Sequence, residues 1–254
     1  MVTDLSTAKI SKSTTPVMLQ PNHRSEASSE LLFGESIQVL EQDGKWCKIS
    51  SKHDNYEGFV KTAACDFSAP ATTHWVSTQA TYAFEKPDIK STICQRVLFG
   101  SKLALAEISG NSKFFKLNNG GYIWAAHVLK KNTALTMSMI EIAQNNYLYA
   151  PYRWGGRSTD GCDCSGLVQM IAMAQGVNLP RDTVDQEPAL PDVEYDNRMA
   201  EDLVYWPGHV GILQTPDLLL HSTAHSMRCC IEPLRDVVQR AGKPSSIKRI
   251  QNND

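Results

Sequence analysis

The chain has 254 residues, of which 42% are apolar and 20% are charged, and its formal net charge at pH 7 is −2. This near-neutral balance argues against a protein that binds nucleic acid or anionic membranes, because both functions need a basic face. No apolar run approaches the roughly 18 to 20 residues that cross a bilayer. The composition predicts a soluble globular protein with one large domain or two to three small ones.

The cellular environment is indicated by the N-terminus and by the cysteines. Residues 1–20 lack the basic and then apolar pattern of a secretory signal. The chain has 7 cysteines, an odd number, and their spacing is not that of a disulfide framework. We therefore expect a reducing, cytoplasmic environment.

Two similar stretches of short apolar runs follow a polar N-terminal segment rich in Ser and Thr. Residues 31–60 contain runs separated by glycine and by an Asp-Gly turn, which is typical of a small antiparallel β-domain. The sequence VLFGS at 97–101 repeats LLFGE at 31–35, and GYIW at 121–124 repeats the pattern of EGFV at 57–60. This self-similarity indicates two copies of one module.

The first copy resembles the bacterial SH3-like domain through the order LFGE, an apolar strand, DGKW and NYEGFV. The resemblance fits residues 15–66 well and residues 73–131 less well. Residues 68–72, with the sequence SAPAT, are the expected linker. A module of this kind is commonly a binding or spacer barrel and not a catalytic part.

After residue 131 the pattern changes to helices followed by strands. Thr136 or Ser138 can cap a first helix that ends near Tyr147. A glycine-rich loop then leads into an apolar helix over 167–174, with Gly176 as a plausible end. Short strands are expected at 203–206, 209–213, 218–221 and 246–250. This order predicts an α+β domain.

Cys164 lies where the glycine-rich loop becomes the apolar helix. A thiol attacks a carbonyl only as the thiolate, and a helix N-terminus beside an imidazole lowers its pKa and supplies a base. His209 begins one apolar run and His221 ends another, so a hairpin could place the two rings side by side as base and orienter. We therefore predict that Cys164 is a catalytic nucleophile.

Two other interpretations of these residues remain open at this point. A cysteine among glycines and apolar residues is often a buried, inert thiol. Cys162 and Cys164, together with His221 and His225, could instead bind zinc. However, C-x-C is tighter than the usual spacing of zinc ligands.

The motifs of residues 135–250 are similar to the NlpC family of papain-like cysteine peptidases. They are PYRWGG, GCDCSGLV, LPRDT and GHVGI, followed by His221. The resemblance implies that Cys164 is the nucleophile, His209 the general base and His221 the residue that orients His209. It also implies that the hydroxyl of Tyr152 joins the Cys164 backbone N–H around the oxyanion. No metal or organic cofactor is implied, and Cys162 stands where the family usually has a larger apolar residue.

Two SH3-like modules ahead of such a domain resemble, more narrowly, the γ-D-glutamyl-L-diamino acid endopeptidases that process free murein peptides. The resemblance implies hydrolysis of the γ-D-glutamyl–diamino acid bond in a murein stem peptide with a free N-terminal L-Ala, through a thioester acyl-enzyme. In that subgroup the first SH3-like module walls off the site and holds the free amine, which needs carboxylate and phenol partners. The candidate substrate-binding residues are Asp163, Ser165, Thr183, Tyr56 and Glu26, with Thr183 facing the D-glutamyl carboxylate.

The expected architecture is an α+β papain-like (NlpC-type) catalytic domain preceded by two small all-β SH3-like barrels. The expected partner is a murein stem peptide, with neither nucleic acid nor a membrane, and the sequence does not indicate an oligomeric state. Two alternative functions remain open: hydrolysis of intact peptidoglycan, and non-enzymatic binding of wall peptides. The predicted domains are an N-terminal arm at 1–14, SH3-like domain 1 at 15–66, SH3-like domain 2 at 73–131 and the peptidase domain at 135–254.

Overall fold

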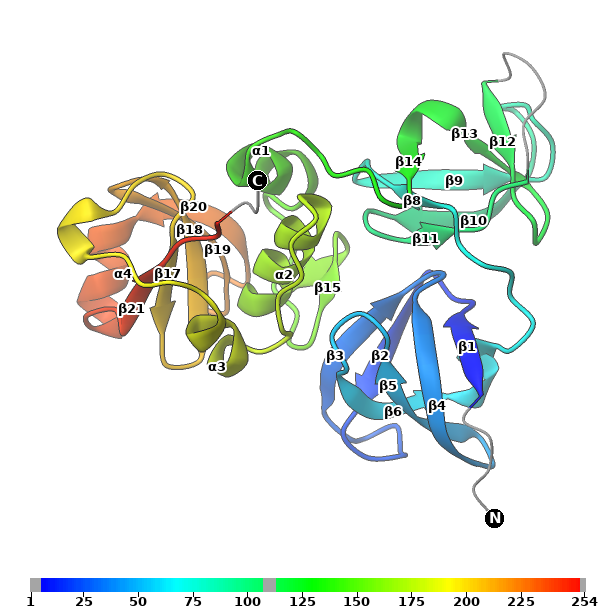
Figure 1. Cartoon of the computed structure of the whole chain (residues 1–254), viewed down its shortest axis with the longest axis horizontal. Coiled ribbons are helices and arrows are strands. Elements are labelled where there is room, and N and C mark those ends of the chain that lie inside the picture. The colour runs from blue at the N-terminus through cyan, green and yellow to red at the C-terminus, as the bar shows by residue number, and fades with distance from the viewer. Residues whose placement is uncertain (1–5, 107–112, 252–254) are drawn as a thin grey trace. The chain divides into compact units, whose positions relative to one another are not determined.

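A computed structural model of the chain describes residues 6–106 and 113–251 (Figure 1). The chain divides into two compact units, Met1–Thr133 and Ala134–Asp254. The first unit is built from strands and short 3₁₀ turns, whereas the second combines helices with a sheet. Over the described ranges, no helix is both long and apolar enough to cross a membrane.

Seven strands of the first module form one antiparallel sheet in the order β3-β2-β6-β5-β4-β1-β7. Side chains alternate along these strands, so that in β5 Cys47 and Ile49 point into a buried core while Trp46 and Lys48 point outward. The strands are β1 (Thr7–Ile10), β2 (Thr14–Met18), β3 (Ala27–Leu32), β4 (Ser36–Asp43), β5 (Trp46–Ser51), β6 (Glu57–Lys61) and β7 (Cys65–Asp66), with the 3₁₀ turn η1 (Thr62–Ala64) before β7.

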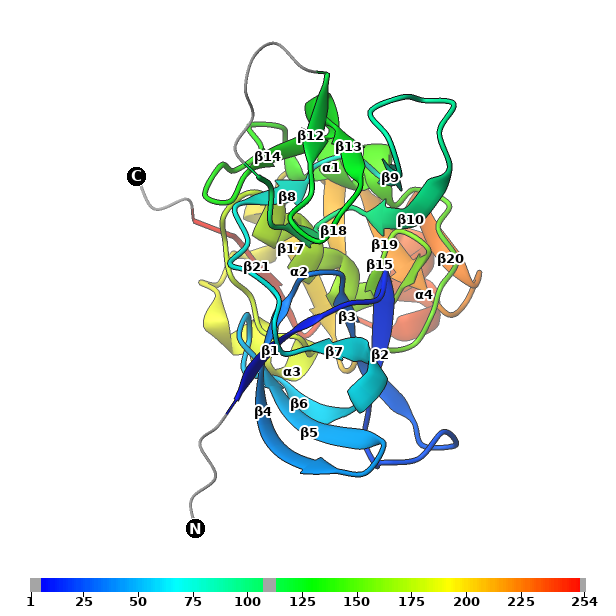
Figure 2. The same cartoon turned by 90° about the vertical axis from the view of Figure 1, so that its right-hand side faces the viewer.

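The N-terminal arm expected at residues 1–14 is wrong for its second half. Strand β1 pairs with β4 on one side and with β7 on the other (Figure 2). Ala8 and Ile10 are only 2% and 1% exposed, so they belong to the core of this module. The strand was missed because two inward-facing apolar residues among polar ones make a weak period-2 signal. Residues 1–5 lie outside the described part of the chain.

The second module repeats the element order of the first. Its strands form a four-stranded sheet, β10-β9-β13-β12, and a three-stranded sheet, β11-β8-β14. The 3₁₀ turn η2 (Ala125–His127) follows β13 as η1 follows β6, and Gly34 and Gly100 of the repeated motif have φ angles of 75° and 85°. The strands are β8 (His74–Val76), β9 (Ala80–Phe84), β10 (Ile93–Leu98), β11 (Lys102–Leu103), β12 (Phe114–Lys116), β13 (Tyr122–Trp124) and β14 (Val128–Lys130).

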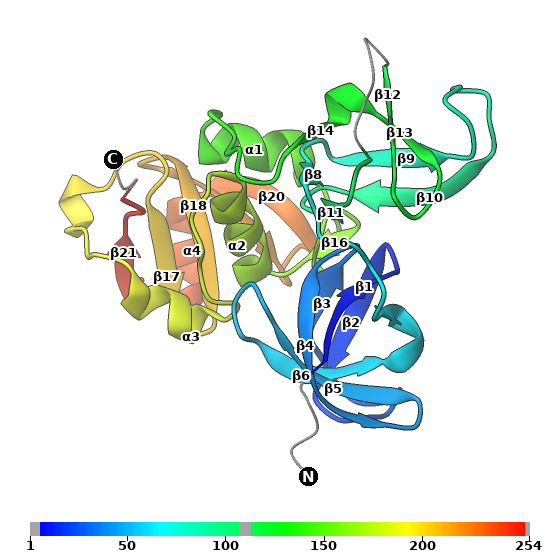
Figure 3. The same ribbon diagram turned by 45° about the vertical axis from the view of Figure 1, so that its right-hand side comes forward.

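The second unit has a five-stranded antiparallel sheet in the order β20-β19-β18-β17-β21. Helix α2 contacts β18 and β19, and α1 lies beside α2 (Figure 3). Helix α4 packs through Leu234 and Val237 against Val204 and Trp206 of β17. The elements are α1 (Met139–Asn146), β15 (Arg157–Ser158), β16 (Gly161–Cys162), α2 (Cys164–Ala174), α3 (Thr183–Gln186), η3 (Glu187–Ala189), η4 (Tyr195–Asn197), β17 (Leu203–Trp206), β18 (His209–Thr215), β19 (Leu218–Thr223), β20 (Arg228–Pro233), α4 (Leu234–Ala241) and β21 (Ser246–Lys248).

Capping residues explain where α1 begins and where α2 ends. Ser138, one of the two expected caps, accepts a hydrogen bond from the Glu141 N–H, and the Glu141 carboxylate accepts one from the Ser138 N–H. Helix α2 is followed by Gly176, whose φ is 83°, a conformation that glycine adopts without strain. Nearly all of α2 is buried, which gives its first residue a rigid support.

Candidate active site

The thiol is carried by the first residue of α2. Asp163 caps this helix by accepting a hydrogen bond from Gly166 N–H at 2.7 Å, and it accepts a second from Gly155 N–H at 2.9 Å. A Cβ at position 166 would lie 2.2 Å from the carbonyl oxygen of Gly156, so only glycine fits there. The glycines of the predicted loop therefore let the backbone at Gly156 lie directly against the first turn of α2.

Arg181 fixes the Asp163 carboxylate from the other side, and the sequence reasoning assigned it no role. Its Nη1 donates to Asp163 Oδ1 at 3.1 Å and its Nη2 donates to Oδ2 at 2.6 Å. Nη1 also donates to Ser165 Oγ at 2.8 Å. Arg181 is 2% exposed, and a buried bidentate pair of this kind stabilises a geometry only when both partners are present. Residues 163 and 165, on either side of the thiol, are thus held by one guanidinium.

The two predicted histidines are brought together by the β18–β19 hairpin. His209 Nε2 lies 2.8 Å from His221 Nδ1. Beyond His221, its Nε2 lies 2.6 Å from Glu232 Oε1, and Arg240 donates to the same carboxylate. The sequence reasoning missed Glu232 and Arg240, so the line of groups behind the thiol is longer than predicted.

The register of β19 and β20 explains why Glu232 is in this position. His221 is paired with Cys230, and Glu232 stands two residues further along β20, on the same face of the sheet. A carboxylate at this diagonal position reaches the far nitrogen of the ring. The sequence RCCIEP of β20 does not alternate between polar and apolar residues, and the strand register cannot be read from the sequence, so no local signal pointed to Glu232.

The Glu232 carboxylate determines which nitrogen is protonated in the rings of His221 and His209. An ionised carboxylate can only accept a hydrogen bond. His221 Nε2 therefore carries a proton and donates a hydrogen bond to Glu232. In neutral His221 the Nδ1 is then the acceptor, and His209 Nε2 must donate to it. His209 Nδ1 is left unprotonated, which is the state that a general base needs.

The backbone on both sides of His209 contacts the thiol. Cys164 Sγ lies 3.8 Å from the carbonyl oxygen of Gly208, and the backbone N–H of Val210 hydrogen-bonds to the sulfur. These contacts place the start of β18, and with it His209, beside Cys164. Trp206 lies at 6.0 Å from the His209 ring, between centroids, and helps to hold it.

Burial dominates the protonation of both reacting groups. It raises the pKa of the Cys164 thiol to about 11, and the nearby Asp163 carboxylate raises it further, against the hydrogen bonds from Val210 and Ser165. Burial also lowers the pKa of His209 to about 4. Burial of the free thiol thus opposes the expected lowering of its pKa. The resting pair is a neutral thiol and a neutral imidazole.

Tyr152 lies close enough to Cys164 and Asp163 for their charges to affect its pKa. Burial raises the pKa of its phenol to about 12, and Cys164 and Asp163 add to this effect. The hydroxyl consequently stays protonated at neutral pH and can donate a hydrogen bond. This is the property that an oxyanion donor requires.

Comparison with known proteins agrees with this geometry. Residues 149–240, which contain Tyr152, Cys164, His209 and Glu232, match the model of the NlpC/P60 family. Residues 17–64 match the model described as the bacterial dipeptidyl-peptidase SH3 domain. The chain is a cysteine peptidase with an NlpC/P60 domain. Its catalytic fold is preceded by a bacterial SH3 domain.

Curated relatives are similar to most of this chain, and a solved structure shares its fold. The chain is 27% identical to dipeptidyl-peptidase 6 of Lysinibacillus sphaericus, over 80% of this chain and 83% of that protein. It is 26% identical to the γ-D-glutamyl-L-lysine dipeptidyl-peptidase of Bacillus subtilis (strain 168), over 76% and 71%. The crystal structure of an NlpC/P60 family protein from Bacillus cereus ATCC 10987 shares the fold, with a TM-score of 0.82 and 18% identity over 96% of this chain and 99% of that one.

The remaining substrate-binding candidates fall in different places. Thr183 is half-buried at the first position of α3 in the NlpC/P60 unit. Tyr56 and Glu26 belong to the SH3 unit: Tyr56 is half-buried against the core of its module, and Glu26 is exposed, with its carbonyl accepting from Leu19 N–H. Ser165 is buried and held by Arg181.

Asp163 departs most from its predicted role. Both oxygens of its carboxylate already accept hydrogen bonds, and Arg181 neutralises its charge. An ammonium group would therefore meet a weakened partner there. The structure gives Asp163 a role in shaping the nucleophile loop of the NlpC/P60 domain.

Metal binding by the NlpC/P60 domain was an open alternative. Within the described residues, the group that comes together is His221, Cys230 and Glu232, whose ligand atoms lie within 4.8 Å of one another. This is not the set of cysteines and histidines that the sequence suggested. Glu232 is occupied by His221 and by the guanidinium of Arg240, which holds positive charge where a cation would bind. The residues fit an orienting network better than a metal centre.

Cys162 is fully buried, and its carbonyl oxygen accepts from Ser222 Oγ at 2.7 Å. Cys229 is equally buried beside it, and burial, with the neighbouring Cys162 and Cys230, raises the pKa of the Cys229 thiol. Buried thiols of raised pKa react slowly. Both residues act as small apolar packing groups of the NlpC/P60 domain.

Proposed function

We propose that this cysteine peptidase hydrolyses the γ-D-glutamyl–diamino acid bond of murein stem peptides that carry a free N-terminal L-Ala. What supports the proposal most is the combination in one chain of an NlpC/P60 domain and an SH3 domain of the dipeptidyl-peptidase type. The likeness to a γ-D-glutamyl-L-lysine dipeptidyl-peptidase also runs through most of both chains. We further propose that residues 73–131 form a second SH3-like copy and that the protein works in the cytoplasm.

The first half of the proposed reaction is acylation of the thiol. Cys164 Sγ bonds to the carbonyl carbon while its proton passes to His209 Nδ1, since the resting pair is neutral. The oxyanion is held by the Cys164 backbone N–H and the Tyr152 hydroxyl. The carbon–nitrogen bond then breaks, and His209 gives the proton to the leaving amine of the diamino acid.

The second half is hydrolysis of the thioester. His209 takes a proton from water, the hydroxide oxygen bonds to the thioester carbon, and the same two donors hold the second oxyanion. The carbon–sulfur bond breaks and the thiolate regains the proton from His209. His221 and Glu232 keep the ring in one tautomer throughout, because neither needs to change its own protonation.

Recognition of the substrate is assigned to residues flanking the thiol and to the first module. Thr183 is proposed to bind the D-glutamyl carboxylate. Tyr56 and Glu26 supply the phenol and carboxylate oxygens that a desolvated ammonium requires. Since Arg181 already pairs with Asp163, these two residues carry more of the amine recognition in this proposal than Asp163 does.

The test compares two substrates with one purified protein. L-Ala-γ-D-Glu-diamino acid should be cleaved, and its N-acetylated form should be cleaved much more slowly, because acetylation removes the ammonium charge. Equal cleavage of both would contradict amine recognition. Strong activity on intact sacculi with little on the free tripeptide would favour a wall hydrolase and would overturn the free-peptide proposal.

A further inference from the structure

A pocket of the first SH3 module has the properties of a ligand site distinct from the predicted amine site. Its volume is about 380 Å³, which is within the range of small-molecule pockets. Neither Tyr56 nor Glu26 lines it. The lining comes from β2, β5, β6 and the segments around them, and it includes Lys12, Thr15, His23, Trp46 and Lys61.

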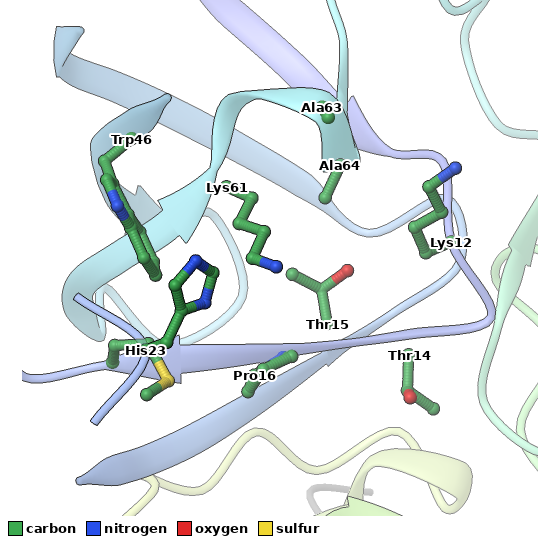
Figure 4. Close-up of a pocket in the computed structure, with 10 residues that line it drawn as sticks. Lys12, Thr14, Thr15, Pro16, His23, Trp46, Lys61, Ala63 and Ala64 are labelled. Carbon is green, nitrogen blue, oxygen red and sulfur yellow. The ribbon is translucent and has the colours of Figure 1, made fainter. Parts of the chain in front are cut away.

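The charge in this pocket is positive and unneutralised. Figure 4 shows the Lys61 ammonium at its centre, near His23 and Thr15, and Lys12 at its far end. No ion pair involves Lys12 or Lys61 within residues 6–106 and 113–251. A neighbouring pocket shares Trp46 and Lys61 with this one and is also lined by Lys45. A lysine at the centre of a pocket without an acidic partner favours an anion.

One wall of the pocket is aromatic. His23 and Trp46 have ring centroids 5.4 Å apart and planes tilted by 57°. Trp46 is paired with Lys61 across strands β5 and β6, so the indole and the ammonium lie side by side. An aromatic ring beside a cation suits a ligand that has an apolar face as well as a negative charge, such as a pyranose ring carrying a carboxylate.

A buried hydroxyl in the lining lacks a partner. Thr15 is 4% exposed, and its Oγ1 has no hydrogen-bond partner within the described chain. Most buried hydroxyls are satisfied, so an orphan of this kind needs an explanation. Rotation about χ1 exchanges the hydroxyl with the similar-sized methyl group and would turn a donor toward the pocket.

We propose that this pocket binds a carboxylate-bearing sugar, with the carboxylate on Lys61, the ring against Trp46 and His23, and the Thr15 hydroxyl as an additional donor. The lining offers donors and one apolar wall but no carboxylate, which disfavours a cationic ligand. This site does not depend on the proposed peptidase reaction, because the ligand contains no γ-glutamyl bond.

Calorimetric titration of the full-length protein tests the proposal with matched pairs of sugars. N-acetylmuramic acid differs from N-acetylglucosamine by a lactyl ether that bears the carboxylate, and glucuronate differs from glucose by its carboxylate. The acid of each pair should bind at least about tenfold more tightly, as expected for a charge-assisted contact. The affinity should fall as salt is raised from low to physiological strength, because the lysines are exposed.

Three variants locate the binding. Lys61→Gln should weaken binding of N-acetylmuramic acid about tenfold, and Thr15→Val should weaken it by a smaller factor without lowering thermal stability, since the hydroxyl has no partner to lose. Lys116→Gln, which removes an exposed lysine from β12 of the second module, should leave binding unchanged.

Four outcomes would overturn the proposal. They are an absence of binding at millimolar concentration, equal binding of acid and neutral sugars, binding that survives Lys61→Gln, and a preference for D-alanyl-D-alanine or glycerol phosphate over both sugar acids. The last outcome would assign the lysines to a peptide carboxylate or to a phosphate instead of a sugar.

Discussion

Glu232 Oε1 lies 2.6 Å from His221 Nε2, and through this contact it determines which nitrogen of His209 is the base. The carboxylate is itself held by Arg240. Burial alone would raise the pKa of Glu232, but its hydrogen bonds to Arg240 and His221 lower it overall. The acid therefore remains an acceptor at neutral pH, and the tautomers of both rings follow from it.

Replacing this acceptor should impair turnover and leave substrate binding nearly intact. In Glu232→Gln the amide can donate to His221 Nε2, which would reverse both tautomers and protonate the basic nitrogen of His209. We expect kcat to fall on the order of 100-fold, less than the ~10⁴-fold seen for a directly bound triad carboxylate, because His221 intervenes. Steady-state kinetics should show the loss in kcat and little change in KM. Glu194→Gln, an exposed acid of the same unit, is the control.

Arg181 should be essential for the stability of the peptidase unit. Arg181→Gln leaves the Asp163 carboxylate, whose side chain is 7% exposed, without its charge partner. Removing one partner of a buried pair typically costs about 3–5 kcal/mol in the free energy of unfolding. The matched control is Arg235→Gln, whose pair with Asp236 is on the surface and is worth about 1 kcal/mol at most. Equal losses in urea unfolding for the two variants would contradict the structural role of Arg181.

Alkylation should show that the free enzyme holds a neutral thiol. With a pKa of about 11, Cys164 is less ionised at pH 7 than an ordinary cysteine, so iodoacetamide should label it slowly and with a rate that rises as pH increases through 9 to 11. The exposed Cys94 provides an internal reference when labelling is followed peptide by peptide. Faster labelling of Cys164 than of Cys94 at pH 7, with a plateau, would indicate a resting thiolate instead.

Stability in acid should depend on His209. Its folded pKa of about 4 is below the ordinary 6.5, so its contribution to stability is present above pH 6.5 and is lost as pH falls through 4. At 1.36 kcal/mol per pKa unit, the wild type should lose up to about 3 kcal/mol more than His209→Gln between pH 7 and pH 4. Urea unfolding across this range measures the difference, with a substitution of the exposed His225 as control. Parallel curves for wild type and His209→Gln would contradict the burial of a neutral ring.

The sequence pointed to the residues that the candidate site brings together, but not to the residues that support them. Cys164, His209 and His221 stand in motifs with recognisable spacing, and the helix cap at Asp163 follows from local chemistry. Glu232, Arg240 and Arg181 became visible only with strand register and tertiary contacts. The thiol pKa could not be predicted because it depends on burial, which opposes the effect of the helix terminus. Strand β1 was missed because only two of its side chains, Ala8 and Ile10, are apolar and face the core.

The pairing of β19 with β20 has a consequence for insertions and deletions. Side chains alternate along a strand, so a slip of a single residue between these two strands would turn Glu232 to the opposite face and bring Ile231 or Pro233 beside His221. Cys164 and His209 themselves would be unchanged. However, without Glu232 nothing would keep the proton on Nε2 of His209 and leave Nδ1 free. The length of the turn over residues 224–227, which joins β19 to β20, therefore matters for function, because it sets the register that brings Glu232 to His221. The protonation state of His209 therefore depends on the hydrogen-bond ladder between β19 and β20, to which His209 itself does not belong.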